Sequence, residues 1–296
     1  HMKQSTLRAC IVNSGCANVC TGERGVRDAF NMCRLVAENL VADEQEFAIA
    51  HVLPFSTGVI GHFLPMDKIQ AGVPRLVAEL SDSPQAGEAF AHGILTTDLV
   101  TKTAYETVTI AGEKITIAGC CKGSGMIAPN MATMLAFVAT DASVPAPALR
   151  RLVRSTADQT FNCVTVDQHT STSDSFVVMA NGRAQRRTIR GGIALSKFAD
   201  ALYRVCDSLA MQIARDGEGA TKLVCVRISG AASASDARRA AAAIANSPLV
   251  KTAIHGSDPN WGRFISAAEY SGAAMEQERS ACKVGAIVVF RRGRPT

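Results

Sequence analysis

The chain has 296 residues, of which 47% are hydrophobic and 19% are charged, and it carries a formal net charge of +5. This composition is typical of a globular protein and excludes a disordered or coiled-coil chain, and the length allows one large domain or two. The positive charge is spread out, except at residues 291–294, and no basic stripe with interleaved aromatic residues accompanies it, so we expect no nucleic-acid partner.

The ten cysteines are scattered, and none forms a Cys-x-x-Cys pair. Without a matching His or Cys cluster they indicate small buried hydrophobic residues in a reducing compartment, and neither a metal site nor a disulfide framework. The sequence contains no signal-peptide pattern and no apolar stretch long enough to cross a bilayer. These features favour a cytoplasmic location and no membrane partner.

The first half of the chain is predicted to contain two helices, a hairpin and a strand. Apolar residues at helical spacing predict an amphipathic helix with the stripe Val26, Phe30, Cys33, Ala37 and Leu40. A second helical pattern over residues 67–80 is expected to kink or restart at Pro74. Polar and apolar residues alternate over 106–118, which predicts a β-hairpin, and an apolar strand is expected over 134–140.

The second half mixes helices and strands without a regular βαβ repeat. Helices are predicted over residues 148–157, from an N-cap at Ser196 to a stop at 216–217, and over 234–245. Strands are predicted over residues 163–166, 176–179, 222–228 and 284–290. The pattern predicts an α/β or α+β fold with mixed sheets sandwiched with helices.

Residues 122–141 carry the most informative pattern, because the step from Ala132 to Thr133 lies between a glycine-rich loop and the apolar strand. A threonine there can attack the preceding carbonyl, convert the peptide bond to an ester and become a new N-terminus after hydrolysis. It would then hold a hydroxyl nucleophile and an α-amine, of pKa roughly 8, that serves as its base. On pattern alone a simple buried strand is favoured, since Ala-Thr steps are common.

Other segments offer groups that acyl transfer needs. Thr57 and Gly58 place a hydroxyl beside a sterically open backbone N–H, which suits an oxyanion hole, although a tight turn with positive φ at Gly58 explains the pattern too. Lys122 opens a glycine loop that lacks the Gly-Lys-Ser/Thr ending of a nucleotide P-loop, so phosphate binding is rejected. Glu218 lies between two glycines that let its carboxylate protrude, and a helix C-cap turn is the alternative.

Residues 256–263 hold the only tryptophan of the chain among turn-forming residues. We interpret them as a rigid loop that shapes a site wall or a contact between chains, with Asp258 and Arg263 able to pair. His255 and His169 do not indicate a catalytic triad, since no serine flanked as Gly-x-Ser-x-Gly occurs.

Several segments match one known family in the same order along the chain. They are residues 12–22, Ser-Thr-Gly-Val-Ile-Gly at 56–61, Ile-Leu-Thr-Thr-Asp at 94–98, the run at 122–141, Asp-Gln-His-Thr-Ser-Thr-Ser-Asp at 167–174, Arg-Asp-Gly-Glu-Gly-Ala-Thr-Lys at 215–222 and residues 246–263. In these segments the chain resembles the ornithine acetyltransferases, which are the glutamate N-acetyltransferases of arginine biosynthesis. The resemblance covers roughly residues 8–290.

The resemblance implies a self-processing acyltransferase that moves an acetyl group from N-acetylornithine to glutamate through an acetyl-Thr133 intermediate. It implies cleavage between Ala132 and Thr133, an oxyanion hole of Thr57 and Gly58, and no metal or cofactor. The implied amino-acid site contains Thr96, Lys122, Thr133 and Glu218. Acetyl-coenzyme A stays open as a second donor, since some family members accept it.

The resemblance also implies an assembly. Residues 1–132 would form one chain with the oxyanion hole and residues 133–296 a second chain with the nucleophile at its start, in one intertwined core of the N-terminal-threonine-nucleophile type. Two such pairs would form a heterotetramer. Family members carry an Asn and a Thr near their C-terminus that complete the substrate site, and these have no counterpart after Arg291.

Two other functions remain open on the sequence. A self-processing amidohydrolase or aminopeptidase would use the same Thr133 chemistry with water as acceptor. A non-catalytic structural homologue would fold without cutting the bond between Ala132 and Thr133.

Overall fold

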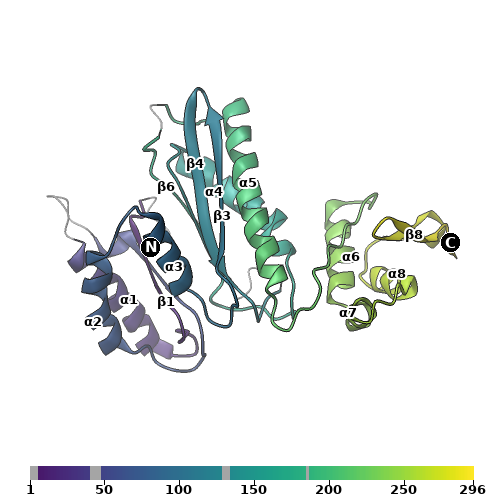
Figure 1. Cartoon of the computed structure of the whole chain (residues 1–296), viewed down its shortest axis with the longest axis horizontal. Helices are drawn as coiled ribbons and strands as arrows, with labels where there is room; N and C mark the ends of the chain where they lie inside the picture. Colours follow the sequence, from purple (N-terminus) through teal and green to yellow (C-terminus); the bar gives the residue numbers. More distant parts are fainter. Residues whose placement is uncertain (1–5, 41–47, 129–133, 185–186) are drawn as a thin grey trace. The chain divides into compact units, whose positions relative to one another are not determined.

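The computed structural model describes residues 6–40, 48–128, 134–184 and 187–296 (Figure 1). The chain forms two compact units. Unit 1 comprises the chain up to Val164 together with His169–Glu218, and unit 2 comprises Thr165–Gln168 and Gly219–Thr296. This division lies elsewhere than the expected cleavage, which stays a prediction.

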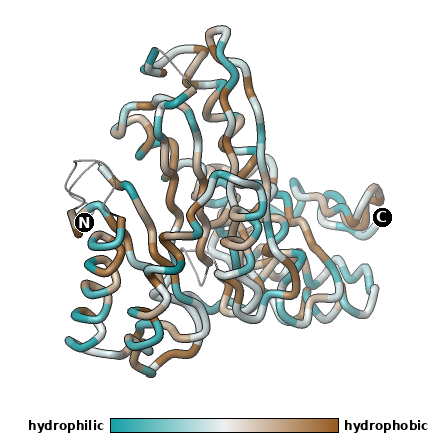
Figure 2. Tube along the Cα trace, turned by 60° about the vertical axis from the view of Figure 1, so that its left-hand side comes forward, coloured by the Kyte–Doolittle hydropathy of each residue, from teal (hydrophilic) through white to brown (hydrophobic). Residues whose placement is uncertain are grey.

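A four-stranded mixed sheet forms the centre of unit 1 in the order β3-β4-β5-β6. Its strands are β3 (Lys102–Ile110), β4 (Glu113–Lys122), β5 (Leu135–Thr140) and β6 (Ser175–Ala180). The β3–β4 and β4–β5 pairs are antiparallel, and β6 is parallel to β5. Figure 2 shows hydrophobic residues along these central strands. The predicted hairpin, the strand over 134–140 and the strand over 176–179 are confirmed.

Helices α4 (Ala146–Gln159) and α5 (Gly192–Arg215) pack against one face of this sheet. The inner face of α5 is an apolar stripe at helical spacing that consists of Phe198, Leu202, Val205, Leu209 and Ile213, all buried. The predicted N-cap at Ser196 is wrong, because α5 begins four residues earlier, after Gly191. The exposed side chain of Ile193 in the first turn leaves no apolar periodicity to mark that start.

The opposite face is covered by a two-stranded parallel sheet, of strands β1 (Ala9–Asn13) and β2 (Val52–Ser56), and by helix α3 (Pro84–Gly93). Helices α1 (Gly22–Asn39) and α2 (Met66–Ala78) pack with β1 and β2 in a separate hydrophobic cluster. Phe137 of β5 joins the layers, since its ring makes edge contacts with Phe55 of β2 and Phe90 of α3 at 5.1 and 5.3 Å between centroids. Helix α2 continues through Pro74, so it does not restart there, and the alternative of a kink stays a prediction.

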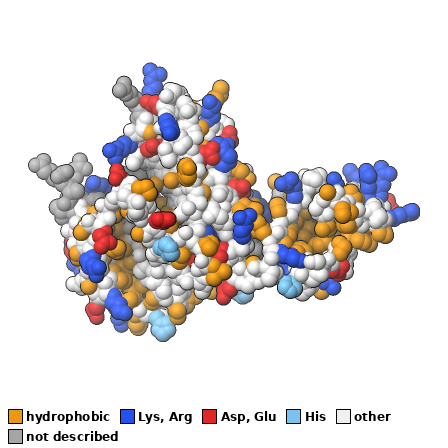
Figure 3. All heavy atoms as spheres, viewed as in Figure 1, with side chains coloured by type: hydrophobic (Ala, Val, Ile, Leu, Met, Phe, Trp, Pro, Cys, Tyr) orange, Lys and Arg blue, Asp and Glu red, His pale blue; other side chains and the backbone are white. Residues whose placement is uncertain are grey.

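Unit 2 contains three helices and a small antiparallel sheet. These are α6 (Ala234–Asn246), α7 (Pro248–His255), α8 (Trp261–Glu269), β7 (Ala281–Val284), β8 (Ile287–Arg291) and β9 (Arg294–Pro295). Figure 3 shows hydrophobic side chains gathered on the visible face of this unit. The indole of Trp261 stacks on the ring of Phe290 at 4.8 Å between centroids, which joins the first turn of α8 to β8.

Several predictions for the second half are wrong. Residues 222–228 form no strand, because no strand of the described residues pairs with their backbone, although Val226 and Ile228 pack against the helical cluster of unit 2. Residues 163–166 are irregular after a 3-10 turn, and the last predicted strand is the two halves of the β7–β8 hairpin. Arg263 donates to the Leu249 carbonyl and the Thr252 hydroxyl at 2.8 and 3.0 Å, and not to Asp258 as expected.

None of the ten cysteines, all of which lie among the described residues, forms a disulfide. Cys33, Cys120, Cys121 and Cys206 are buried, as expected, and burial raises the pKa of Cys120 and Cys206 to about 12, so these thiols stay protonated. Cys20, Cys163 and Cys225 are exposed, contrary to the expectation. Within the described ranges, no helix combines the length and the apolar character that a bilayer span requires.

Candidate active site

Thr57 and Gly58 follow directly after β2 in unit 1. Thr57 is buried, with 2% of its surface exposed, and its backbone N–H donates to the carbonyl of Asn13 over 3.1 Å. Gly58 has φ of +127°, as the turn interpretation predicted, and a Cβ there would overlap the backbone of Gly15 and Cys16. Only glycine tolerates both the positive φ and the close approach of the neighbouring backbone, so these two constraints define the position of the Gly58 backbone.

Lys122, the last residue of β4, donates from its ammonium group to the hydroxyl of Thr57 over 3.1 Å. Both side chains are buried, and each has 2% exposure. An ammonium group only donates, so the Thr57 oxygen accepts here and its own proton is left to point at another acceptor. The pair therefore offers an O–H donor with a positive charge directly behind it, which is what an oxyanion requires.

Two nearby carboxylates counteract the effect of burial on the pKa of Lys122. Burial lowers the pKa of Lys122, and the negative charges of Asp98 and Asp174 act against that shift. Burial alone would raise the pKa of Asp98, yet hydrogen bonds from Lys102 and from the Gly123 N–H hold it below its usual range. Asp98 is therefore a carboxylate at neutral pH.

Asp174 directly precedes β6 and holds Met134, the residue before β5, which follows the predicted nucleophile in the sequence. One of its oxygens accepts from the backbone N–H of Met134 over 2.9 Å, and its other oxygen is buried without a hydrogen-bond partner within the described residues. Burial raises the pKa of this carboxyl to about 7, against the opposing effects of backbone N–H donors and of Lys122. The Met134 carbonyl accepts in turn from the Ser175 N–H over 2.9 Å.

Glu218 lies against the loop that follows Lys122. Its backbone N–H donates to the carbonyl of Ser124 over 2.9 Å, and its carboxylate occupies the space that a Cβ on Gly125 would take. The side chain is exposed, as the flanking glycines predicted. A carboxylate beside this loop is suited to the ammonium group of an amino acid.

The structure thus brings some of the predicted site residues together and leaves Thr96 at the edge of the group. Thr57 and Lys122 are in direct contact, and Glu218 reaches the same loop through Ser124. Thr96 is exposed and is tied to the group only through its backbone N–H, which donates to Asp98 over 3.2 Å. Ala132 and Thr133 lie outside the described residues, and the chain resumes at Met134.

Sequence reasoning assigned no role to Asp98 or Asp174, although both stand in the matching segments. It also gave no role in the site to Asp216, which stands in a matching segment, or to Lys102, which stands in none. The contact that joins these two residues spans 114 positions of the chain. No group of three or more His, Cys, Asp or Glu side chains that could hold a metal ion occurs in the part of the chain that the structure describes.

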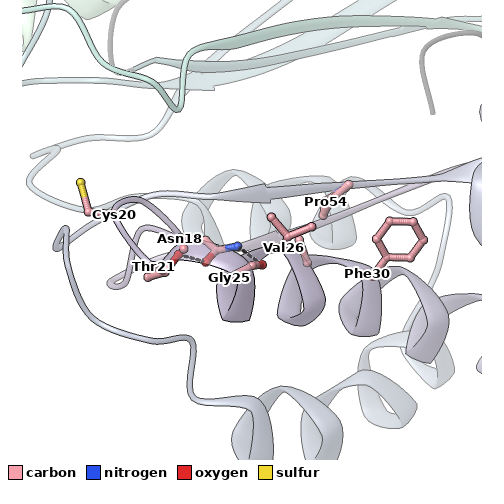
Figure 4. Close-up of a pocket in the computed structure, with 9 residues that line it drawn as sticks. Asn18, Cys20, Thr21, Gly25, Val26, Phe30 and Pro54 are labelled. Carbon is pink, nitrogen blue, oxygen red and sulfur yellow. Dashed lines mark hydrogen bonds between the residues drawn. The ribbon is translucent and has the colours of Figure 1, made fainter.

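A separate cavity of about 420 Å³ opens at the start of α1 (Figure 4). Its wall is formed mostly by apolar side chains, including Val26 and Phe30, which were expected to face the core and are exposed instead. The side chain of Asn18 connects two residues of the cavity wall. It accepts a hydrogen bond from the Thr21 hydroxyl over 2.7 Å and donates one to the Gly25 carbonyl over 2.8 Å. None of the described residues predicted for the active site lines this cavity.

Comparison with known proteins decides the family. The model of the ArgJ family matches residues 1–296. The chain belongs to the ArgJ family. Among curated ArgJ proteins, the arginine biosynthesis bifunctional protein ArgJ of Symbiobacterium thermophilum is 50% identical over 290 residues, which cover 98% of this chain and 70% of that protein. The ArgJ protein of Geobacillus kaustophilus is 46% identical over 293 residues, which cover 99% and 70%.

A solved ArgJ structure gives the same answer for the fold. The crystal structure of the arginine biosynthesis bifunctional protein ArgJ from Bacillus halodurans matches with a TM-score of 0.53 and 45% identity, over 54% of this chain and 76% of that chain. The expected family, the mixed α/β fold and the enzyme class, an acyltransferase of arginine biosynthesis, are therefore confirmed.

Proposed function

We propose that this ArgJ protein transfers an acetyl group from N-acetylornithine to glutamate through an ester on Thr133. The observation that carries the proposal is the buried contact of Lys122 with Thr57 beside the constrained Gly58. This arrangement supplies the donors that a tetrahedral oxyanion needs, in a chain whose family acts in arginine biosynthesis.

The chemistry begins with self-cleavage between Ala132 and Thr133. The Thr133 hydroxyl attacks the Ala132 carbonyl, the amide nitrogen leaves as an amine, and water hydrolyses the resulting ester. The freed α-amine of Thr133 then takes the proton of its own hydroxyl when that hydroxyl attacks the acetyl carbonyl. Thr133 lies outside the described residues, so this step rests on the sequence and on the anchored neighbour Met134.

The oxyanion of each tetrahedral intermediate accepts from the Thr57 hydroxyl and the Gly58 N–H. Collapse of the intermediate expels the amine of ornithine with a proton and leaves the acetyl ester on Thr133. Glutamate enters, its amine attacks the ester, and N-acetylglutamate leaves, which gives ping-pong kinetics. Exclusion of water during the acetyl-enzyme stage keeps the reaction a transfer.

Lys122, Glu218 and Thr96 bind the amino-acid part of both substrates. The carboxylate of Glu218 pairs with a substrate ammonium group, and Lys122 adds positive charge near the substrate carboxylate and the reacting carbonyl. Acetyl-coenzyme A is a second candidate donor for the same Thr133.

The working protein is an assembly of two chains, residues 1–132 and 133–296. Strand β5 supports this, because it lies between β4 of the first segment and β6 of the second and would hold the fragments together after cleavage. We propose a dimer of such pairs, a heterotetramer in the cytoplasm, without a nucleic-acid or membrane partner.

Isotope exchange tests the function. Labelled ornithine is incubated with unlabelled N-acetylornithine, and the label appearing in N-acetylornithine is compared with the acetate released. A transferase that passes through acetyl-Thr133 exchanges label faster than it hydrolyses acetylornithine. Release of acetate without exchange would establish an amidohydrolase instead, and the absence of both would establish a non-catalytic homologue.

A further inference from the structure

Lys102 is a completely buried lysine at the first residue of β3, with 0% of its surface exposed. Its ammonium group donates to Asp98 over 2.7 Å, to Asp216 over 2.6 Å and to the Val100 carbonyl over 3.3 Å. These acceptors match the three donors of an ammonium group, so Lys102 is fully satisfied. The proposed reaction gives it no part.

The carboxylate of Asp98 connects Lys102 to two segments of the amino-acid site. One oxygen accepts from the backbone N–H of Gly123 over 2.6 Å, which fixes the loop directly after Lys122. The other oxygen accepts from the backbone N–H of Thr96 over 3.2 Å. A displacement of Asp98 would therefore move both Thr96 and the chain at Lys122.

Asp216 connects Lys102 to the third segment. Its carboxylate accepts from the Leu99 N–H over 3.1 Å, and its carbonyl accepts from the Ser124 hydroxyl over 2.7 Å. The Ser124 carbonyl accepts from the N–H of Glu218 over 2.9 Å. Thr96 is thus held by Asp98 directly, and Lys122 precedes Gly123, whose N–H Asp98 holds. Glu218 is two residues from Asp216 and bonds to Ser124, which Asp216 also holds.

We propose that Lys102 is a positioning residue for the amino-acid site, and that with Asp98 and Asp216 it sets the geometry in which Thr96, Lys122 and Glu218 meet the substrate. The inference rests on the proposed function for the identity of that substrate, an α-amino acid or its N-acetyl derivative. Two carboxylates face Lys102, and the charge of Lys122 acts on one of them, so the group contains two cations and two anions.

Such a buried charged group adds little to the free energy of unfolding, because desolvation of the charges offsets most of their attraction. Its hydrogen bonds fix particular backbone N–H groups, and a geometric role explains that arrangement. A purely structural role predicts a less stable enzyme with normal substrate affinity. A positioning role predicts weakened amino-acid binding with an intact nucleophile.

The test compares Lys102→Met with the matched control Lys114→Met, which removes an exposed lysine from the same hairpin. Binding of ornithine and of glutamate is measured by calorimetry, and KM and kcat are measured for acetyl transfer. Acylation by p-nitrophenyl acetate is followed separately, since this ester requires the nucleophile and oxyanion hole but not the amino-acid site. Asp216→Asn provides a milder second variant that keeps the pair of Lys102 with Asp98.

We expect Lys102→Met to weaken ornithine and glutamate binding and to raise KM about 10- to 100-fold. The rate with p-nitrophenyl acetate should fall by a smaller factor, because this ester uses Lys122 only through its contact with Thr57 and makes no use of Thr96 or Glu218. Asp216→Asn should shift binding in the same direction, and it carries the test if Lys102→Met does not fold. Unchanged amino-acid binding in a folded variant would overturn the inference. A wild-type chain that binds ornithine without transferring acetyl groups would refute the proposed function, while the binding comparison would still decide the role of Lys102.

Discussion

The hydroxyl of Thr57 accepts a hydrogen bond from the ammonium group of Lys122 over 3.1 Å, and both side chains are buried. This contact orients the hydroxyl proton away from the lysine, because the threonine oxygen already serves as the acceptor. It joins the proposed oxyanion hole after β2 to the last residue of β4, which stand 65 residues apart in the chain.

Replacement Thr57→Val should remove both the proposed oxyanion donor and the acceptor of Lys122 while keeping the shape of the side chain. We expect kcat for acetyl transfer to fall by about 100- to 1000-fold, as for loss of one oxyanion-hole donor. Thr57→Ser keeps the hydroxyl and should stay within about tenfold of wild type. Steady-state kinetics measure both, and equal losses in the two variants would argue that the hydroxyl has no part in the reaction.

Replacement Gly58→Ala should destabilise the fold strongly. The new Cβ meets the backbone of Gly15 and Cys16 at a φ of +127°, so we expect a loss of about 3 kcal/mol or more in the free energy of unfolding. Gly61→Ala is the matched control, because φ there is +85° and the space is open, and it should cost about 1–2 kcal/mol. Urea unfolding measures both, and similar losses would mean that the close approach at Gly58 is unimportant.

Replacement Gly125→Ala should displace the carboxylate of Glu218 with little effect on stability, because that carboxylate is the movable end of a long side chain. We expect KM for glutamate and N-acetylornithine to rise about tenfold, and the free energy of unfolding to change by less than about 1 kcal/mol. Gly87→Ala, in the exposed part of α3 with open space around it, should leave KM unchanged. An unchanged KM in Gly125→Ala would count against a substrate contact for Glu218.

The pKa of Asp174 gives the stability a defined pH dependence. Burial raises this pKa from 3.8 in the unfolded chain to about 7 in the fold. The folded protein therefore holds a proton that the unfolded chain has released, and the contribution to stability, complete below about pH 4, is lost as the pH rises through about 7. Asp174→Asn cannot titrate and should flatten this dependence.

Urea unfolding at about pH 5 and about pH 8 tests the prediction. Wild type should lose more stability than Asp174→Asn between these values, and the difference between the two proteins cancels the contribution of every group that they share. An identical loss in both proteins would show that the carboxyl of Asp174 is already ionised in the folded protein at about pH 5.

The order of polar, apolar and glycine residues within short segments predicted the hairpins and turns, because these form between neighbours in the sequence. Alternation around residues 111–113 gave the β3–β4 hairpin, in which Ala111 and Gly112 have the positive φ values of a tight turn, and Gly58 has the positive φ that its turn interpretation required. The strand expected at 222–228 failed because alternation does not reveal whether a partner strand exists.

The candidate site was predictable only in part for the same reason. Thr57, Gly58, Lys122 and Glu218 stand in short segments whose composition indicated their chemistry. The ion pair of Lys102 with Asp216 joins residues 114 apart, and no local feature of β3 or α5 signals it. Contacts of that range depend on the packing of whole elements, which the sequence of one segment does not contain.

A denaturing intact-mass spectrum, recorded after brief exposure of the protein to N-acetylornithine, shows whether Thr133 carries the acetyl group. We expect two fragments that meet at Ala132 and Thr133, with the fragment that begins at Thr133 heavier by one acetyl group, and a single unmodified chain for Thr133→Ala. A single uncut wild-type chain, or an acetyl group carried by the fragment that ends at Ala132, would contradict the claim that Thr133 is the nucleophile.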